Sequence, residues 1–262
     1  MLEPIAYAPA QLRVGLLYEG IPMSSSYKTI SRINERIVKL KNEFAGCLDY
    51  FEKANLFTGP SLYFHFKTCA IRKMYPSAVA TLSDKNFFES LYATLTAWGM
   101  HRMGPGNTKL VDLEDMRISF IRQSNKIAEI ESFILSELER NVIVDITSRL
   151  WEIILQLKVG IGGTKIVANS KALHHLLPNL IPPIDREYTL RFFYNHTTLN
   201  QGDEKAFKEI YPFLYIIASS KKELIRERLG HGMNTSETKV IDNAIVGFGR
   251  KYIKIKENKS EE

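Results

Sequence analysis

Residues 157–192 read LKVGIGGTKIVANSKALHHLLPNLIPPIDREYTLRF, and the rest of the chain is interpreted outward from this stretch. A glycine cluster at Gly160, Gly162 and Gly163 separates two segments of helical character, and the second segment runs to Pro178 with apolar residues at helical spacing. Backbone N–H groups at the start of a helix bind phosphate well, because the helix N-terminus is electropositive and glycine permits close approach. The stretch therefore predicts a helix, a tight glycine turn with an anion site, and a second helix.

Two parts of this stretch resemble the helix-hairpin-helix DNA glycosylases. Residues 159–168, VGIGGTKIVA, are similar to the hairpin of that family. The segment Pro183-Ile184-Asp185, followed by a helix that contains Arg191, resembles the segment that carries the catalytic aspartate of the family. Lys165 falls where the bifunctional members keep their Schiff-base lysine, and Asp185 follows 20 positions later (185 − 165), close to the interval in the family.

The resemblance implies an all-α fold in which two helical lobes flank a cleft, with the helix-hairpin-helix motif at its centre. A damaged nucleotide would be flipped into that cleft. The resemblance also implies that backbone carbonyls of the hairpin hold a monovalent cation, with no other cofactor. The residues that would grip backbone phosphates at the hairpin are Gly160, Gly162, Gly163 and Thr164.

Asp185 is the candidate for the chemical step. Cleavage of an N-glycosidic bond passes through a transition state with positive charge on the sugar, which a fixed carboxylate stabilises. A carboxylate there can also deprotonate the attacking water or amine. An aspartate between Pro-Pro and a helix is equally an ordinary N-cap, and the two interpretations are compatible because a capping aspartate is oriented and ionised.

Lys165 is the candidate amine for lyase chemistry through a Schiff base. The alternative is a surface or phosphate-contacting lysine near the turn. Lys171 and Arg186 are better suited to neutralising backbone phosphates than to chemistry. The hypothesis is thus a glycosylase in which Asp185 excises the base, with or without an AP lyase step at Lys165.

A second candidate contact lies at Trp98, His101 and Arg102, just before a loop signal at residues 104–107. An indole offers a flat face for stacking, and the two following residues offer positive charge for phosphates. The alternative is a buried tryptophan that closes the core, followed by two exposed polar residues.

The histidines and cysteines do not form a recognisable metal motif. His174 and His175 are adjacent on a helix and point about 100° apart, so they cannot easily share one ion. We expect one to pack in the interior and the other to face water. The two cysteines, Cys47 and Cys69, provide neither a disulfide framework nor a zinc pattern.

Helical periodicity extends over most of the chain, and convincing strand alternation is absent. We expect an irregular N-terminal arm over 1–30, one all-α domain of two lobes over 31–256 with the hairpin and catalytic segment at 157–192, and a charged tail over 257–262. A proline at position 212 is expected to kink or divide a helix over about 204–219.

The composition is consistent with a DNA-binding protein. The chain has 262 residues, of which 45% are apolar, a net charge of +6 (35 − 29) and an isoelectric point of about 9.1. This balance weakly favours an anionic partner, here double-stranded DNA with a damaged or modified base. No run of apolar residues is long enough to span a membrane and no export signal is recognised, so we expect an intracellular protein, cytoplasmic or associated with the nucleoid.

Two alternatives remain open at this stage. In the first, the chain binds DNA with the hairpin as a phosphate clamp and has no catalytic activity. In the second, it is a helical scaffold in which the glycines make a tight turn only.

Overall fold

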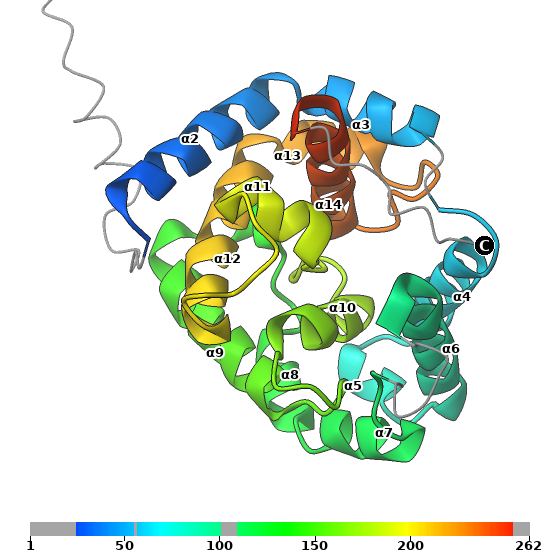
Figure 1. Ribbon diagram of the computed structural model, residues 1–262. Coiled ribbons are helices and arrows are strands. Elements are labelled where there is room, and N and C mark those ends of the chain that lie inside the picture. Colours follow the sequence, from blue (N-terminus) through cyan, green and yellow to red (C-terminus); the bar gives the residue numbers. More distant parts are fainter. Residues whose placement is uncertain (1–24, 55–56, 101–108, 254–262) are drawn as a thin grey trace, which may run out of the picture.

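The structure is a computed structural model that describes residues 25–54, 57–100 and 109–253. Within these ranges the chain forms helices and turns, and the only extended pairing is an isolated antiparallel bridge between Leu110 and Gly160. The all-α fold class is therefore confirmed (Figure 1).

The first half of the described chain is a series of short and medium helices. They are α2 (Tyr27–Asn42), α3 (Phe44–Ala54), α4 (Pro60–Lys73), α5 (Ala78–Thr81), α6 (Lys85–Leu95), the π-helical turn η1 (Thr96–Met100), α7 (Leu113–Ile121) and α8 (Ser124–Ile130).

The second half contains the longest helices and the stretch quoted above. Its elements are η2 (Leu135–Glu137), η3 (Arg140–Val142), α9 (Ile143–Gln156), α10 (Ile166–Leu176), η4 (Arg186–Leu190), α11 (Arg191–Tyr194), α12 (Asp203–Ser220), α13 (Lys222–Arg228), α14 (Glu237–Phe248) and η5 (Gly249–Ile253).

Helix α2 begins inside the segment that the sequence assigned to an irregular arm. The Ser26 side chain accepts a hydrogen bond from the Thr29 amide and so caps the helix, whose first residue is Tyr27. The helix therefore begins four residues before the position expected from the sequence, residue 31. The rest of the expected arm, 1–24, and the expected tail, 257–262, lie outside the described residues.

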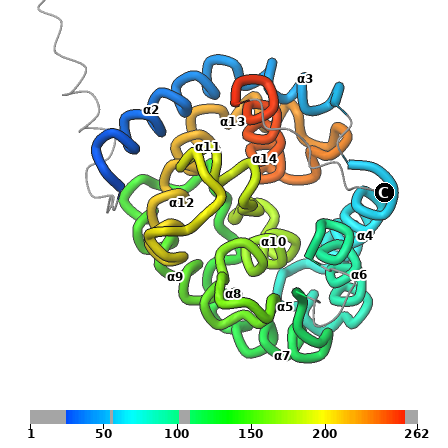
Figure 2. The backbone as a smooth tube through the Cα atoms, in the orientation of Figure 1, coloured from blue at the N-terminus to red at the C-terminus, as the bar shows by residue number. Residues whose placement is uncertain are grey.

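Helix α10, which follows the glycine turn, lies at the centre of the fold. It contacts α9 and α12 on one side and α4 and α6 on the other (Figures 1 and 2). Nearly all of its residues are buried, including the polar side chains of Asn169 and Ser170. Asn169 donates hydrogen bonds to the carbonyl oxygens of Ile154 (2.7 Å) and Leu157 (2.9 Å), which are orphan acceptors at the end of α9. The two helices on either side of the glycines are therefore joined directly by these side-chain-to-backbone hydrogen bonds.

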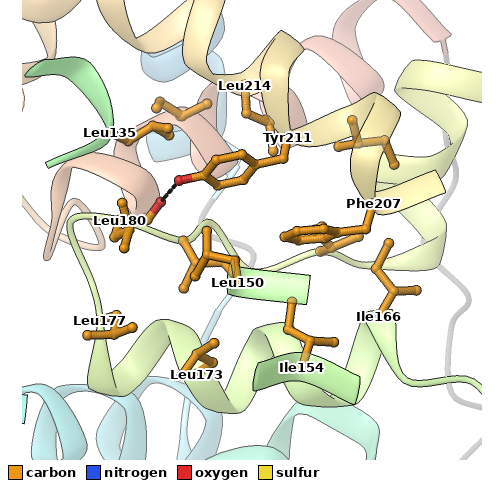
Figure 3. Close-up of a cluster of buried hydrophobic side chains, with 14 of the residues drawn as sticks. Leu135, Leu150, Ile154, Ile166, Leu173, Leu177, Leu180, Phe207, Tyr211 and Leu214 are labelled. Atoms are coloured by element: carbon orange, nitrogen blue, oxygen red, sulfur yellow. Dashed lines mark hydrogen bonds between the residues drawn. The ribbon is translucent and has the colours of Figure 1, made fainter. Parts of the chain in front are cut away.

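Helices α9, α10 and α12 share the main hydrophobic core (Figure 3). Leu150 from α9 and Leu173 from α10 meet Phe207 and Tyr211 from α12, and the Tyr211 hydroxyl donates to the Leu180 carbonyl oxygen at 3.0 Å. Helix α12 remains continuous through Pro212, so the expected division did not occur. The residues on both sides of this proline are fully buried, and their packing offsets the missing amide hydrogen bond.

No helix in the described ranges combines the length and the apolar character needed to cross a membrane.

Candidate functional site

The glycine turn is anchored to a segment that lies about 50 residues earlier in the chain. The Val111 amide donates to the Val159 carbonyl oxygen and the Ile161 amide donates to the Lys109 carbonyl oxygen, each at 3.0 Å. A Cβ at Gly160 would lie 3.3 Å from the Lys109 oxygen, which is a tight contact. Glycine at position 160 is therefore explained by the close approach of these two segments.

The next two glycines have no such explanation. A Cβ added at Gly162 or Gly163 would meet nothing within 4 Å, and neither residue has a positive φ. Both are exposed, and the neighbouring Ile161 is 63% exposed, which is unusual for a large apolar residue. The fold does not require glycine at these two positions, whereas close approach by a ligand would.

The start of α10 differs from the expected open anion site. The Asp203 carboxylate accepts from the backbone amides of Lys165 and Ile166, the latter at 3.1 Å. Two of the amides expected to bind phosphate are thus occupied by a carboxylate of the chain itself. The amides of Gly162 and Gly163 have no acceptor among the described residues, so these remain for an anion.

Beside this turn lies a pocket of about 1180 Å³. Its volume is sufficient for a nucleoside-sized ligand, since small-molecule pockets occupy roughly 300–1000 Å³. The pocket-lining residues used below are Phe57, Trp98, Gly160, Ile161, Gly162, Thr164, Lys171, Asp185, Arg186, Tyr188, Lys239 and Asp242.

Asp185 both caps a helix and lines the pocket. Its Oδ1 accepts from the amides of Tyr188 (2.6 Å) and Thr189 (3.4 Å), while its own amide donates to the Thr189 hydroxyl at 3.3 Å. Its Oδ2 has no partner among the described residues. The cap interpretation is therefore confirmed: one oxygen fixes the carboxylate, and the other remains available to a ligand in the pocket.

Arg186 connects the aspartate segment to the glycine turn. One terminal nitrogen of its guanidinium donates to the Thr164 hydroxyl and the other donates to the Thr197 carbonyl oxygen, both at 3.2 Å. The side chain is exposed and lines the pocket. This places a positive charge at the pocket beside the turn, while Lys171 of α10 adds a second.

Trp98 lines the pocket and is not fully buried in the core. Its indole N–H donates to the Ser61 carbonyl oxygen at 3.3 Å, and its ring lies 5.3 Å from His65 and 5.1 Å from His175, measured between centroids. The tryptophan is therefore fixed by its neighbours and still partly exposed towards the pocket.

The structure brings most, but not all, of the expected site residues together. Those that line the pocket are Trp98, Gly160, Gly162, Thr164, Lys171, Asp185 and Arg186. Gly163 and Lys165 are not among the pocket-lining residues. His101 and Arg102 lie outside the described residues.

The pocket residues that the sequence did not predict include two charged ones, Lys239 and Asp242 of α14. Their signal was present in the sequence, because a lysine and an aspartate stand three positions apart in a helix rich in apolar residues. Ser236 caps this helix, with its hydroxyl accepting from the Lys239 amide at 3.3 Å.

Both His174 and His175 are buried, which corrects the expectation that one of them faces water. The His175 Nδ1–H donates to the Lys171 carbonyl oxygen at 2.8 Å, which leaves its Nε2 as an acceptor for the His65 Nδ1–H at 3.0 Å. His65 Nε2 then accepts from the Thr235 hydroxyl at 3.0 Å. Burial lowers the pKa of His175 to about 4 and the pKa values of His65 and His174 well below the ordinary value, so all three rings are neutral.

Cys69 joins these rings, and the Cys69, His65 and His175 side chains place one ligand atom each within 4.8 Å of one another. Imidazole and thiolate are ligands that zinc prefers. Both nitrogens of His65 are already used in hydrogen bonds, however, and burial raises the pKa of the Cys69 thiol. Metal binding here would have to break this network and remove the thiol proton. We therefore interpret the cluster as structural, with the His65 and His175 rings packed against Trp98.

Comparisons of the chain with models of known protein families, with curated proteins and with solved structures found no match.

Proposed function

We propose that this protein is a DNA N-glycosylase that binds a flipped nucleotide in the pocket and uses Asp185 to excise its base. The observation that carries the proposal is the position of Asp185, a pre-oriented carboxylate in a nucleoside-sized pocket beside the glycine turn.

The contacts of Asp185 support the proposed chemical step. As the C1′–N bond breaks, the base leaves with the bonding electrons and positive charge develops on the sugar, next to the carboxylate. Water then bonds to C1′ and gives a proton to Asp185, and this proton passes through solvent to the departing base, so that Asp185 ends ionised as it began. Because amide hydrogen bonds already fix Oδ1, the carboxylate does not reorganise during this step.

The surroundings of the pocket suit a nucleic acid. Lys171 and Arg186 supply positive charge for phosphates, and the unexplained glycines at 162 and 163 permit close approach of a backbone. The exposed Ile161, which directly precedes these two glycines, is an apolar side chain that a base can contact. Trp98 adds an aromatic face for a flipped base.

The proposed reaction is hydrolytic. Lys165, the amine expected from the sequence resemblance, does not line the pocket that Asp185 lines. A Schiff base at C1′ would require its amine to reach the same sugar carbon as the aspartate. Strand cleavage that needs no alkali would contradict this part of the proposal.

The test is a panel of end-labelled duplexes that carry uracil, hypoxanthine, 8-oxoguanine, hydroxymethyluracil or alkylated purines, treated with protein and then with alkali or a neutral quench. We expect alkali-dependent cleavage of at least one duplex by the wild-type protein. Asp185→Asn should reduce the rate at least a hundredfold, as is usual when a positioned acid–base group is lost, because asparagine caps a helix equally well but carries no charge.

Asp112→Asn is the matched control, since Asp112 caps α7 in the same way, by accepting from the Glu114 amide at 2.8 Å, but does not line the pocket. This variant should keep wild-type activity. Base release by Asp185→Asn at the wild-type rate would refute the mechanism. Salt-dependent DNA binding with no base release from any duplex would instead support the non-enzymatic clamp.

A further inference from the structure

The pocket contains a buried lysine that the proposed chemistry does not use. Lys239 is only 1% exposed, yet it lines the pocket. Its ammonium donates to Asp242 Oδ2 at 2.5 Å and to Asn243 Oδ1 at 2.8 Å. Burial of an ion pair is costly, and apolar side chains of similar size often stabilise a fold equally well. A role in ligand binding would explain why the pair is retained at this position.

The ammonium also lies over aromatic rings. Its nitrogen is 5.2 Å from the centroid of Phe57, 5.8 Å from that of Trp98 and 5.9 Å from that of Phe51. These distances are within the range of cation–π attraction. The aromatic wall of the pocket therefore already carries a positive charge, and a second cation placed there would meet repulsion from the first.

The same pair offers a donor and an acceptor side by side. An ammonium has three N–H groups, and two of those of Lys239 have acceptors among the described residues. Asp242 Oδ1 has no partner among them, and its side chain is 7% exposed in the pocket. Burial raises the pKa of Asp242, and the charge of Asp185 nearby raises it further, while Lys239 opposes this shift.

We propose that Lys239 and Asp242 select a neutral base with a lactam edge, in which a ring N–H stands next to a carbonyl, and reject cationic alkylated bases. The carbonyl accepts from Lys239 and the ring N–H donates to Asp242, as the edges of uracil, hypoxanthine and guanine-type bases allow. This inference rests on the proposed function, because it names the class of base that the pocket takes.

The first test measures nucleoside binding and needs neither DNA nor catalysis. The chain has two tryptophans, so Trp151→Phe leaves Trp98, which lines the pocket, as the sole tryptophan, and its fluorescence is excited selectively. Titrations would use inosine, a neutral lactam, 1-methylinosine, which lacks the N–H, and 1-methyladenosine, which is a cation. We expect inosine to bind about tenfold or more tightly than either analogue, since a hydrogen bond to a charged group contributes roughly 1.5–3 kcal/mol.

The second test removes the pair as a unit. Lys239→Met leaves Asp242 buried without its cation and is liable to unfold, so it is combined with Asp242→Asn. We expect the folded double variant to lose the preference for inosine. Lys85→Met is the control, because Lys85 is exposed on α6 and does not line the pocket. Equal binding of the three nucleosides by the wild-type pocket, or a preference for 1-methyladenosine, would overturn the inference without any need for the variants.

The duplex panel separates this inference from the proposed function. Suppose that the protein releases an alkylated cationic purine in an Asp185-dependent reaction and leaves the lactam bases intact. This result would refute the proposed selection of lactam bases and support the proposed glycosylase activity. Tight binding of inosine that depends on Lys239, without base release from any duplex, would support the Lys239–Asp242 binding site and refute the glycosylase activity.

Discussion

Asp185 is oriented before any ligand arrives, through hydrogen bonds that involve only its own helix. The amides of Tyr188 and Thr189 hold Oδ1, and the Thr189 hydroxyl accepts from the Asp185 amide. Such local bonds follow from sequence position, which is why the sequence could identify this residue as a cap. Its candidacy as a catalytic group came from the family resemblance. The side chains of Lys239 and Asp242, in contrast, reach the pocket from a helix more than 50 positions later.

The buried histidines predict that stability falls as the pH drops below about 6.5. In the unfolded chain each ring takes up a proton near its ordinary pKa of 6.5, whereas burial holds the pKa of His175 at about 4 and lowers those of His65 and His174. Between the ordinary pKa and the lowered pKa values, the unfolded state binds more protons than the folded state. The free energy of unfolding therefore decreases as the pH falls through this range. The loss is about 1.4 kcal/mol per pH unit for each histidine.

Urea unfolding at about pH 7.5 and about pH 5.5 measures this dependence. His65→Gln should make it shallower, because glutamine keeps a donor and an acceptor but does not take up a proton. His231→Gln is the control, since His231 is exposed. A free energy of unfolding that is constant between the two pH values would contradict the prediction.

At the scale of elements, the glycines of this chain serve different purposes. Gly160 permits the turn to pair with the 109–111 segment, and Gly247 permits α14 to cross α3 closely. Gly162 and Gly163 meet neither requirement. Position along the chain does not distinguish these cases, because the relevant neighbours of Gly160 and Gly247 come from distant segments.

Gly247→Ala should destabilise the protein strongly. The added Cβ would lie 2.0 Å from the carbonyl oxygen of Cys47, so the backbones of α3 and α14 would have to separate. Overpacking of this kind costs about 1–3 kcal/mol or more, and thermal unfolding would show it as a lower Tm. Gly163→Ala is the matched control, for which we expect a Tm equal to or slightly above that of the wild-type protein. Equal Tm values for the two variants would show that α3 and α14 do not cross so closely.

At the scale of the whole molecule, the net charge of +6 matters less than where the cations lie. Many of the charged residues form ion pairs on the surface, such as Arg228 with Asp49 and Lys208 with Glu204. Lys171 and Arg186 instead stand at one pocket, beside glycines with open amides. In the proposed function, these cations would hold a polyanion at this face.

Lys171→Ala should weaken DNA binding and make the affinity less dependent on salt concentration. Each phosphate contact contributes about 0.9 to the slope of log affinity against log salt concentration, so the slope should fall by about 1. Fluorescence anisotropy with a labelled duplex over a range of salt concentrations measures this value. Lys85→Ala, which removes an equal charge away from the pocket, should leave the slope unchanged. Equal slopes for the wild-type protein and Lys171→Ala would show that Lys171 does not contact a DNA phosphate.

The sequence by itself determined the all-α class, the glycine turn between α9 and α10, and the cap at Asp185, because helical periodicity, glycine turns and caps depend on residues close in the chain. It could not determine that Asp203 covers the start of α10, that Pro212 leaves α12 continuous, or that both adjacent histidines are buried. Those features depend on packing between distant segments. The tertiary structure alone brought Asp185, Trp98 and the Lys239–Asp242 pair to one pocket, since these residues come from separate helices whose meeting is decided by how their apolar faces pack.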